Sequence, residues 1–281
     1  MIPPEFDYAA PDSLDAALQA LADGGEDAKP LAGGHSLLPL MRLRLAAPTL
    51  LVDLRRVPGL RALERENGGW RIGALSRHAD LQRRAELGVL AETTALIADQ
   101  QVRNRGTIGG SLAHGDPASD LPAVLLATEG TVTVRGSAGT REIAAADLFE
   151  DYMTTAIAPG EILTEVRVPA LDGWGHAYEK FTRRAEDWAM VAVCALVSRA
   201  DDGSCADVRV ALTNMGSTPL RATAVEEALR GRPLDDETIA RAAEQAAEGT
   251  APPGDLNASP DYKRHLARVL TRRALRRAAE G

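Results

Sequence analysis

The chain has 281 residues, 45% of them hydrophobic and 26% charged, with a formal net charge of −8. This length is too great for one ordinary core and suits two or three modest domains. The acidic balance argues against a general nucleic-acid-binding protein, because phosphate binding needs clustered positive charge. The two cysteines, Cys194 and Cys205, cannot supply the four thiolates of a usual iron–sulfur cluster or a Cys-rich zinc site. Their apolar surroundings predict buried free thiols.

The N-terminal residues, 1–8, show no basic stretch followed by an apolar run, so we expect no signal peptide. No segment approaches the roughly 18 unbroken apolar residues of a membrane span. Together these features predict a soluble, cytoplasmic protein.

The first part of the chain combines short strands with short helices. Ser13 is placed to cap an amphipathic helix that ends at Gly24-Gly25. Asn67-Gly68-Gly69 is typical of a hairpin turn between two strands. The other expected strands cover 29–31, 49–54, 60–66, 70–75, 131–135 and 162–168, and the other expected helices cover 77–85, 89–99 and 121–128.

A boundary is expected at 169–175, where Pro, Asp and two Gly fall within seven residues. Strands over 176–181, 189–198 and 206–212 follow it, and then helices over 222–229 and 235–248. A Pro-Pro-Gly linker at 251–254 precedes a last helix over 261–279. We therefore predict an α+β protein with domains at 1–172 and 173–281.

One candidate binding segment is the loop that follows the strand at 29–31. Adjacent glycines allow a sharp backbone turn and leave amide groups uncovered, which suits phosphate oxygens. An ordinary strand-to-helix turn would explain the same residues, and neither the Gly-x-Gly-x-x-Gly pattern nor the P-loop pattern is present. The loop consists of Ala32, Gly33, Gly34, His35, Ser36 and Leu37.

A second glycine-containing loop offers backbone access together with hydroxyl groups. Its residues are Thr107, Ile108, Gly109, Gly110 and Ser111. An acidic side chain beyond it could accept hydrogen bonds from sugar or ribityl hydroxyls. Asp116 and Ser119 are explained equally well as caps of the helix near 121, and for Asp120 capping and ligand binding stay open.

Other polar residues give weaker indications. His35 and His114 have no second His or Cys at metal-ligand spacing, so no metal site is expected. Ser36 lacks the Gly-x-Ser-x-Gly context of a hydrolytic nucleophile. Lys180 on a strand and Trp188 before the next strand fit a solvated hairpin, and the basic residues at 272–277 fit a solvated or partner-binding helix face.

Three of these segments, in the same order, resemble the FAD-binding medium subunits of the molybdenum hydroxylase family, to which carbon monoxide and xanthine dehydrogenases belong. They are 32–41, the stretch 107–111 with His114-Gly115-Asp116-Pro117 and Asp120, and 180–189. The resemblance spans almost the whole chain. It implies an FAD-binding domain of the vanillyl-alcohol-oxidase type, with two α+β subdomains. A smaller domain with a three-stranded antiparallel sheet and helices would follow.

The resemblance also implies roles for individual residues. The two glycine loops, 32–37 and 107–111, would cradle the pyrophosphate of FAD, and Asp120 would take ribityl or ribose hydroxyls. Leu163 would contact the flavin ring through its backbone, with Lys180 and Trp188 near the ring. Ser111 departs from the Asn or Asp of many relatives, and the cysteine count leaves no room for the additional four-iron cluster of some relatives.

In this family a large molybdopterin-binding subunit hydroxylates the substrate, and a small subunit carries two two-iron two-sulfur clusters. The resemblance therefore implies a flavin relay to an external electron acceptor, in an assembly that we expect to be a dimer of heterotrimers. It assigns no catalytic residue to this chain. A free-standing FAD-dependent oxidase or reductase and a non-redox nucleotide-binding scaffold are the alternatives.

Overall fold

The computed structural model describes residues 2–66 and 68–281, and it begins with a small parallel sheet. In this N-terminal unit the strand order is β1-β3-β2, and helix α1 carries the chain from β1 to β2. The Ser13 hydroxyl accepts a hydrogen bond from the Ala16 amide at 3.2 Å, which confirms the predicted cap. The elements are β1 (Asp7–Ala9), α1 (Leu14–Gly24), β2 (Ala28–Leu31), α2 (Leu37–Leu43) and β3 (Leu50–Asp53).

A five-stranded antiparallel sheet forms the central unit, with strand order β4-β5-β10-β6-β7. Its strands are β4 (Leu63–Glu66), β5 (Gly69–Gly73), β6 (Thr131–Gly136), β7 (Gly139–Ala144) and β10 (Ile162–Pro169), and β8 (Phe149–Asp151) and β9 (Thr154–Thr155) form a separate hairpin. Its helices are α3 (His78–Leu81), α4 (Val89–Ala95), α5 (Gln100–Arg103), α6 (Ile108–His114), α7 (Asp120–Ala127) and α8 (Ala145–Leu148).

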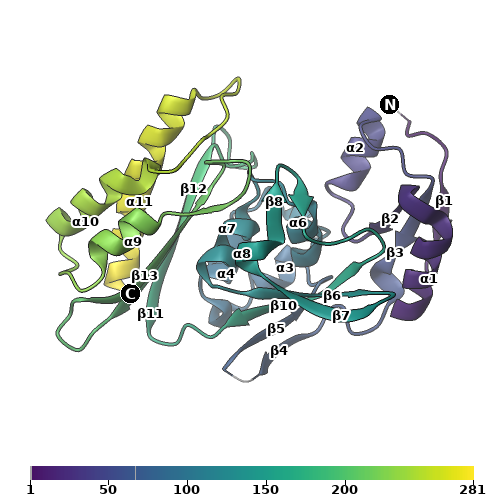
Figure 1. Ribbon diagram of the computed structural model, residues 1–281, viewed down its shortest axis with the longest axis horizontal. Helices are drawn as coiled ribbons and strands as arrows, with labels where there is room; N and C mark the ends of the chain where they lie inside the picture. The colour runs from purple at the N-terminus through teal and green to yellow at the C-terminus, as the bar shows by residue number, and fades with distance from the viewer. Residues whose placement is uncertain (1, 67) are drawn as a thin grey trace.

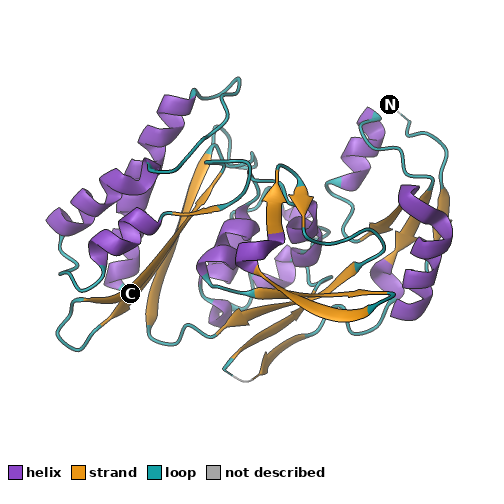
Figure 2. Cartoon of the chain, viewed as in Figure 1, coloured by secondary structure: helices purple, strands orange, loops and turns teal. Residues whose placement is uncertain are grey.

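The C-terminal unit is an antiparallel sheet of order β11-β12-β13-β14, covered on its outer side by helices (Figures 1 and 2). Along β12, Ala192, Cys194 and Leu196 pack into the core of the central unit, whereas the alternate residues pack under the outer helices. Both faces of this strand are therefore buried, which explains its unbroken apolar run. The elements are β11 (Trp174–Phe181), β12 (Val191–Arg199), β13 (Cys205–Thr213), β14 (Leu220–Arg221), α9 (Thr223–Leu229), α10 (Asp236–Ala243) and α11 (Pro260–Glu280).

Helix α7 lies where the central and C-terminal units meet, and all eight of its residues are buried. Its core residues belong to the same hydrophobic cluster as the inner face of β12. The functional candidates on α7 and β11 are thus held in a rigid, apolar setting. Both cysteines are free and fully buried, as predicted.

Several sequence predictions need correction. The C-terminal sheet has four strands instead of three, because the two-residue strand β14 pairs with β13. The helix expected over 77–85 ends at Leu81, since Arg84 adopts non-helical dihedral angles, and the helix expected over 89–99 ends at Ala95, before the left-handed Ala98. Within the second glycine loop, 107–111, Thr107 is the N-cap and residues 108–111 form the first turn of helix α6.

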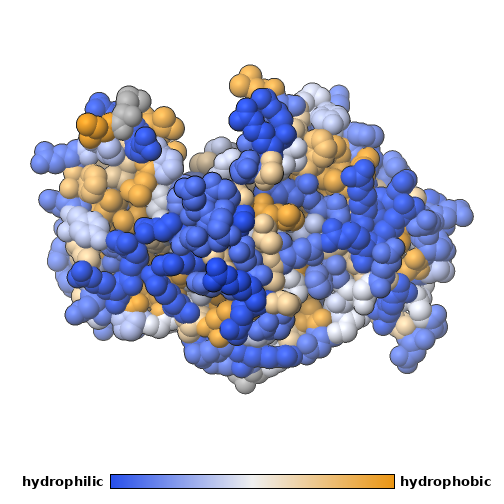
Figure 3. Space-filling view, turned by 180° about the vertical axis from the view of Figure 1, so that it is seen from behind, coloured by the Kyte–Doolittle hydropathy of each residue, from blue (hydrophilic) through white to orange (hydrophobic). Residues whose placement is uncertain are grey.

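The predicted hairpin is present as the antiparallel pair β4–β5, although Asn67 of its turn lies outside the described residues. No helix in the described part of the chain is long and apolar enough to cross a membrane. Seen from behind, the molecule is mostly hydrophilic, and it is hollowed at the top between the N-terminal and C-terminal units, above the central unit (Figures 1 and 3).

Candidate functional site

The two glycine loops, far apart in the sequence, lie against each other. A Cβ atom placed on Gly33 would lie 2.3 Å from the Arg105 carbonyl oxygen, and one placed on Gly110 would lie 3.6 Å from the Ala32 Cβ. Gly34 has φ +80°, a conformation that L side chains rarely adopt. Gly33 therefore leaves no room for a side chain beside the 105–106 backbone and Gly34 needs its positive φ, whereas Gly110 meets Ala32 at an ordinary contact distance.

Backbone and side-chain hydrogen bonds fix the second glycine loop in place. The Thr107 hydroxyl accepts a hydrogen bond from the Gly110 amide at 3.1 Å, so Thr107 caps α6. The Ile108 and Gly109 amides donate to the carbonyls of Ser76 and Ala74 at 3.0 and 2.9 Å. These bonds hold the first turn of α6 against the segment that follows β5, and Gly110 lies toward the first loop.

A cleft with an arginine-rich lining opens beside the meeting point of the loops. Arg55 is ion-paired with Asp53 at 2.6 Å, whereas Arg61, Arg77 and Arg105 form no ion pair within the described residues. The lining consists of Ala32, Gly33, Arg55, Arg61, Leu75, Arg77, Arg105 and Thr107. In an acidic chain, this concentration of positive charge favours an anionic group such as a phosphate.

Two histidines flank the same loops. Burial and the neighbouring Arg105 guanidinium lower the pKa of His35, which lies on the first loop. His78 packs beneath the second loop, where its amide donates to the Gly106 carbonyl at 3.1 Å and its ring would contact any side chain at Gly106. Burial is the largest cause that lowers the pKa of His78, to about 4. Both rings are thus neutral at pH 7.

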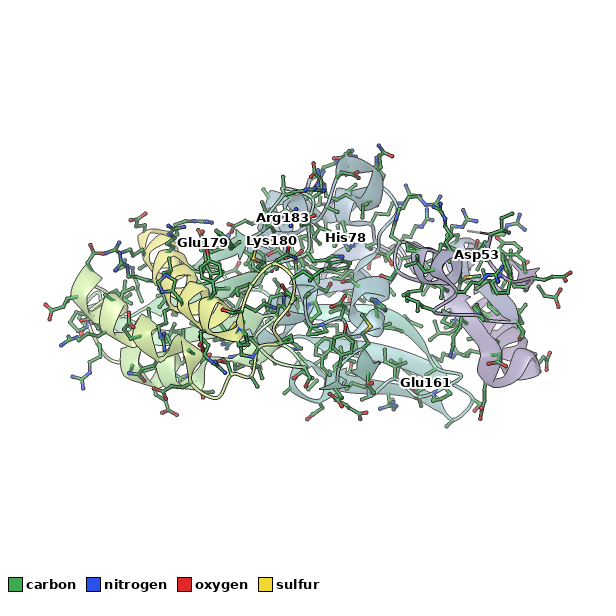
Figure 4. All side chains as sticks on the ribbon, turned by 90° about the horizontal axis from the view of Figure 1, so that it is seen from above. Asp53, His78, Glu161, Glu179, Lys180 and Arg183 are labelled. Carbon is green, nitrogen blue, oxygen red and sulfur yellow. The ribbon has the colours of Figure 1, made fainter. Side chains whose placement is uncertain are left out.

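A buried charged network joins α7 to β11. Lys180 donates to one Asp120 oxygen and the Tyr178 hydroxyl donates to the other, each at 2.8 Å. Asp120 is 3% exposed and Tyr178 is 1% exposed. Burial raises the pKa of the Asp120 carboxyl, even though Lys180 and Tyr178 lower it. Figure 4 shows Lys180 between the C-terminal helices and the central unit.

The remaining predicted residues occupy different surroundings. Leu163 is buried on β10 at a register shift, and its neighbour Thr164 accepts a hydrogen bond from the Ala74 amide at 2.9 Å. Trp188 lies between β11 and β12 with 56% of its surface exposed. Asp116 accepts from the Ala118 amide at 2.8 Å, a turn-stabilising role, and Ser119 is the N-cap residue of α7 but makes no capping bond with its side chain. Ser119 instead shares a 2.8 Å hydrogen bond with Ser111.

Comparison with known proteins matches the chain over nearly its full length. Residues 4–171 match the model of the FAD binding domain in molybdopterin dehydrogenase, and residues 176–278 match the CO dehydrogenase flavoprotein C-terminal domain. The chain belongs to the FAD-binding medium subunits of the molybdenum hydroxylase family.

Individual relatives agree with this membership. The carbon monoxide dehydrogenase medium chain of Hydrogenophaga pseudoflava is 43% identical, with 99% of this chain and 98% of the relative covered. A subunit of the 6-hydroxypseudooxynicotine dehydrogenase complex of Paenarthrobacter nicotinovorans is 42% identical, with 99% and 96% covered. The solved carbon monoxide dehydrogenase from Hydrogenophaga pseudoflava superposes with a TM-score of 0.96, covering 99% of this chain and 98% of that chain at 43% identity.

The site geometry fits the FAD of this family. The close approach at Gly33 leaves no room for a side chain between the two segments, and the adjoining cleft carries the positive charge that a diphosphate requires. Sequence reasoning selected both glycine segments, and it named Lys180 and Asp120 separately without their contact, but it missed Arg61, Arg77 and His78. Their signal in the sequence is weak, because they are scattered over a stretch that reads as ordinary strand and helix. Within the described residues, no group of His, Cys, Asp and Glu side chains is arranged to hold a metal ion.

Proposed function

We propose that this chain is the electron-transfer subunit of a molybdenum-containing hydroxylase. It would receive electrons from the iron–sulfur clusters of a partner subunit and pass them through FAD to an external acceptor. The observation that carries the proposal is the pair of glycine loops beside the arginine-lined cleft, in a chain that matches the medium subunits from end to end. When bound, FAD supplies a carrier that accepts single electrons and delivers one or two.

The chain's own residues would bind and orient that carrier. We assign the pyrophosphate to the two loops, 32–37 and 107–111. The second is held in place by the Thr107 cap and by the bonds of its Ile108 and Gly109 amides to the segment that follows β5. Asp120 is assigned to the ribityl or ribose hydroxyls. Its carboxylate can accept about four hydrogen bonds, so Tyr178 and Lys180 leave acceptor capacity for a ligand.

The flavin ring is assigned to the boundary between the central and C-terminal units. Leu163 would approach it through the backbone, Lys180 would place a positive charge near it, and Trp188 would cover it. The large exposed indole of Trp188 supports this assignment, because an aromatic surface left open on the protein can pack against a planar ring.

We also propose that the substrate chemistry and the iron–sulfur clusters belong to other chains. Both cysteines are buried in the C-terminal sheet, and burial raises the pKa of the Cys194 thiol and that of Cys205 to about 11. Neither thiol is placed to hold a cluster.

The partners would be a large molybdopterin-binding subunit and a small two-iron two-sulfur subunit, in a dimer of heterotrimers. A domain division after Asp172 and a cytoplasmic location stay predictions from the sequence.

The decisive experiment compares the chain alone with the chain co-expressed with its partners. Alone, it should bind FAD and exchange electrons with artificial carriers, yet hydroxylate nothing. With its partners, addition of substrate should bleach the flavin absorbance. Turnover of an aldehyde or heterocycle by the isolated chain would favour the free-standing oxidase instead, and a colourless protein that cannot be loaded with FAD would favour the nucleotide-binding scaffold.

A further inference from the structure

A corner at the end of β13 connects two segments that the proposed flavin site uses. Asn214, the first residue after the strand, adopts a left-handed conformation with φ 61° and is 8% exposed. Its amide donates to the Pro117 carbonyl at 2.8 Å. Its side-chain Nδ2 donates to the carbonyls of Ala189 and Met190 at 2.9 and 3.1 Å.

These three acceptors stand next to candidate flavin residues. Pro117 lies between the helix of the second glycine loop and Asp120, and Ala189 follows Trp188 directly. Asn214 therefore binds two segments at one point. One is the connection between β11 and β12, residues 182–190, which we call the Trp188 turn. The other is the connection between α6 and α7 with the first residue of α7, residues 115–120, which we call the Asp120 segment. The backbone N–H of Asn214 binds Pro117, and the side-chain amide of Asn214 binds the Trp188 turn.

The corner continues into the charged network. Thr213, directly before Asn214, is fully buried, and its hydroxyl lies 3.5 Å from the Tyr178 hydroxyl, which donates to Asp120. A displacement of this corner would thus be felt at both Asp120 and Trp188. Buried hydrogen bonds of this kind define one arrangement, because leaving their acceptors unsatisfied is costly.

We propose that Asn214 is a positioning residue of the flavin site, which sets the place of the Trp188 turn relative to the Asp120 segment. This inference rests on the proposed function, since it assumes that Trp188 and Asp120 contact FAD. Asparagine suits the position because it tolerates the left-handed conformation and has two side-chain N–H donors for two carbonyls.

The substitution Asn214→Gly separates the side chain from the backbone. Glycine accepts positive φ and keeps the amide that bonds Pro117, while both bonds to the Trp188 turn are lost. The matched control is Asn257→Gly. Its exposed side chain accepts a hydrogen bond at 3.1 Å from Arg183 of the same turn, so the control also removes a side-chain contact to the turn, but at the surface.

Three readouts are measured on the full chain: the FAD dissociation constant, the visible circular dichroism of bound FAD, and time-resolved anisotropy of Trp188. The Trp188 signal is obtained by subtracting matched Trp188→Phe proteins. In Asn214→Gly we expect a larger fast component of the Trp188 anisotropy decay, an altered flavin dichroism band and roughly threefold to tenfold weaker FAD binding. Asn257→Gly should resemble wild type in all three.

Unchanged Trp188 motion in Asn214→Gly would overturn the inference, as would increased motion with unaltered flavin dichroism and affinity. A lowered Tm with normal flavin signals would show a structural role alone and count against it equally. If the glycine variant is insoluble, the same measurements are made on Asn214→Asp, which keeps the size of the side chain but replaces its N–H donors with a carboxylate. Misfolding of both variants would show that Asn214 is required for folding, and the positioning role would be rejected. If the wild-type protein binds no FAD, the proposed function fails. The anisotropy measurement still tests whether the Asn214 side chain restrains the Trp188 turn.

Discussion

Asp120 and Lys180 are 60 positions apart in the sequence and form a buried ion pair at 2.8 Å, with side chains 4% and 6% exposed. The pair connects α7 of the central unit to β11 of the C-terminal unit. Tyr178 adds a second hydrogen bond to the same carboxylate. Two residues that sequence reasoning assigned separately to a ligand are thus first of all partners of each other.

Removing the lysine should therefore cost stability as well as cofactor binding. Lys180→Met keeps an apolar stem of similar length but leaves the Asp120 charge buried without its partner, which typically costs about 3–5 kcal/mol. We expect urea denaturation to show this loss at pH 7, and a Lys180→Met/Asp120→Asn double variant to recover much of it. Wild-type stability in the single variant would mean that the pair contributes nothing.

The loss should also depend on pH. Because burial already raises the pKa of Asp120, removal of Lys180 raises it further, and the folded state then favours the protonated acid. A raised folded pKa gives stability that is present at low pH and lost as the pH rises through it. Lys180→Met should therefore be less destabilised in acid than at neutral pH, as measured by urea midpoints across the pH range.

Gly110→Val should remove most FAD while leaving the chain folded. An added Cβ would lie 2.8 Å from the capping hydroxyl of Thr107, and the valine methyl groups would extend from there toward Ala32, whose Cβ is 3.6 Å from that Cβ; Gly110 is not among the positive-φ glycines, so backbone strain is not the cause. Ala113→Val, on the exposed side of the same helix, is the control for adding a β-branched residue to α6. Flavin content per folded protein is the measurement, and equal content in both variants would remove the loop from the cofactor site.

His78 should make the stability fall in mild acid. Its folded pKa of about 4 lies below the ordinary histidine pKa of about 6.5, so the unfolded chain binds the proton first. A depressed pKa of this kind contributes stability that is present above the unfolded value and lost as the pH falls through the folded one, at most about 3 kcal/mol. His78→Gln should flatten the pH dependence between those values, and His265→Gln, at an exposed position, should not. The same slope in all three proteins would contradict this assignment.

The sequence predicted long, strongly patterned elements well and short ones poorly. The last helix was expected over 261–279 and is observed as Pro260–Glu280, because its cap and its periodicity are both present in the sequence. Strands of two or three residues such as β1, β9 and β14 carry no period, and they form because neighbouring strands offer hydrogen bonds. The ends of α3 and α4 depend on backbone conformations that tertiary packing imposes.

The candidate site shows the same division. Glycines adjacent in the sequence revealed both loops, since their spacing reflects local backbone demands. The Lys180–Asp120 pair, the Asn214 corner and the arginine cleft depend on which distant segments come into contact. The residue pattern of a single sequence does not predict those contacts. Arg105 alone had a local signal, because it directly precedes the second glycine loop.

FAD should be held without a covalent bond. His35 is the histidine on the first loop, and the resemblance does not require a covalent link at this position. Acid precipitation should therefore leave the yellow colour in the supernatant. Flavin that stays in the pellet after washing with denaturant would show a covalent attachment.

The arginine cleft should make FAD binding sensitive to salt. Arg61 and Arg105 have no ion-pair partner among the described residues, so their charge is available to the cofactor phosphates. At about 8 Å in a water-like medium each phosphate charge contributes about 0.5 kcal/mol per arginine, which predicts roughly twofold to fivefold weaker binding for each Arg→Gln change. Added salt should weaken FAD binding to wild type more than binding to an Arg61→Gln/Arg105→Gln double variant, because screening acts on charges that the variant lacks.

Arg83→Gln, an exposed arginine outside the cleft lining, is the control and should leave both the dissociation constant and its salt dependence unchanged. Titration of the apoprotein with FAD at several ionic strengths measures both quantities. A dissociation constant that responds neither to salt nor to the double substitution would place the phosphates away from the cleft, and its positive charge would then serve another anion.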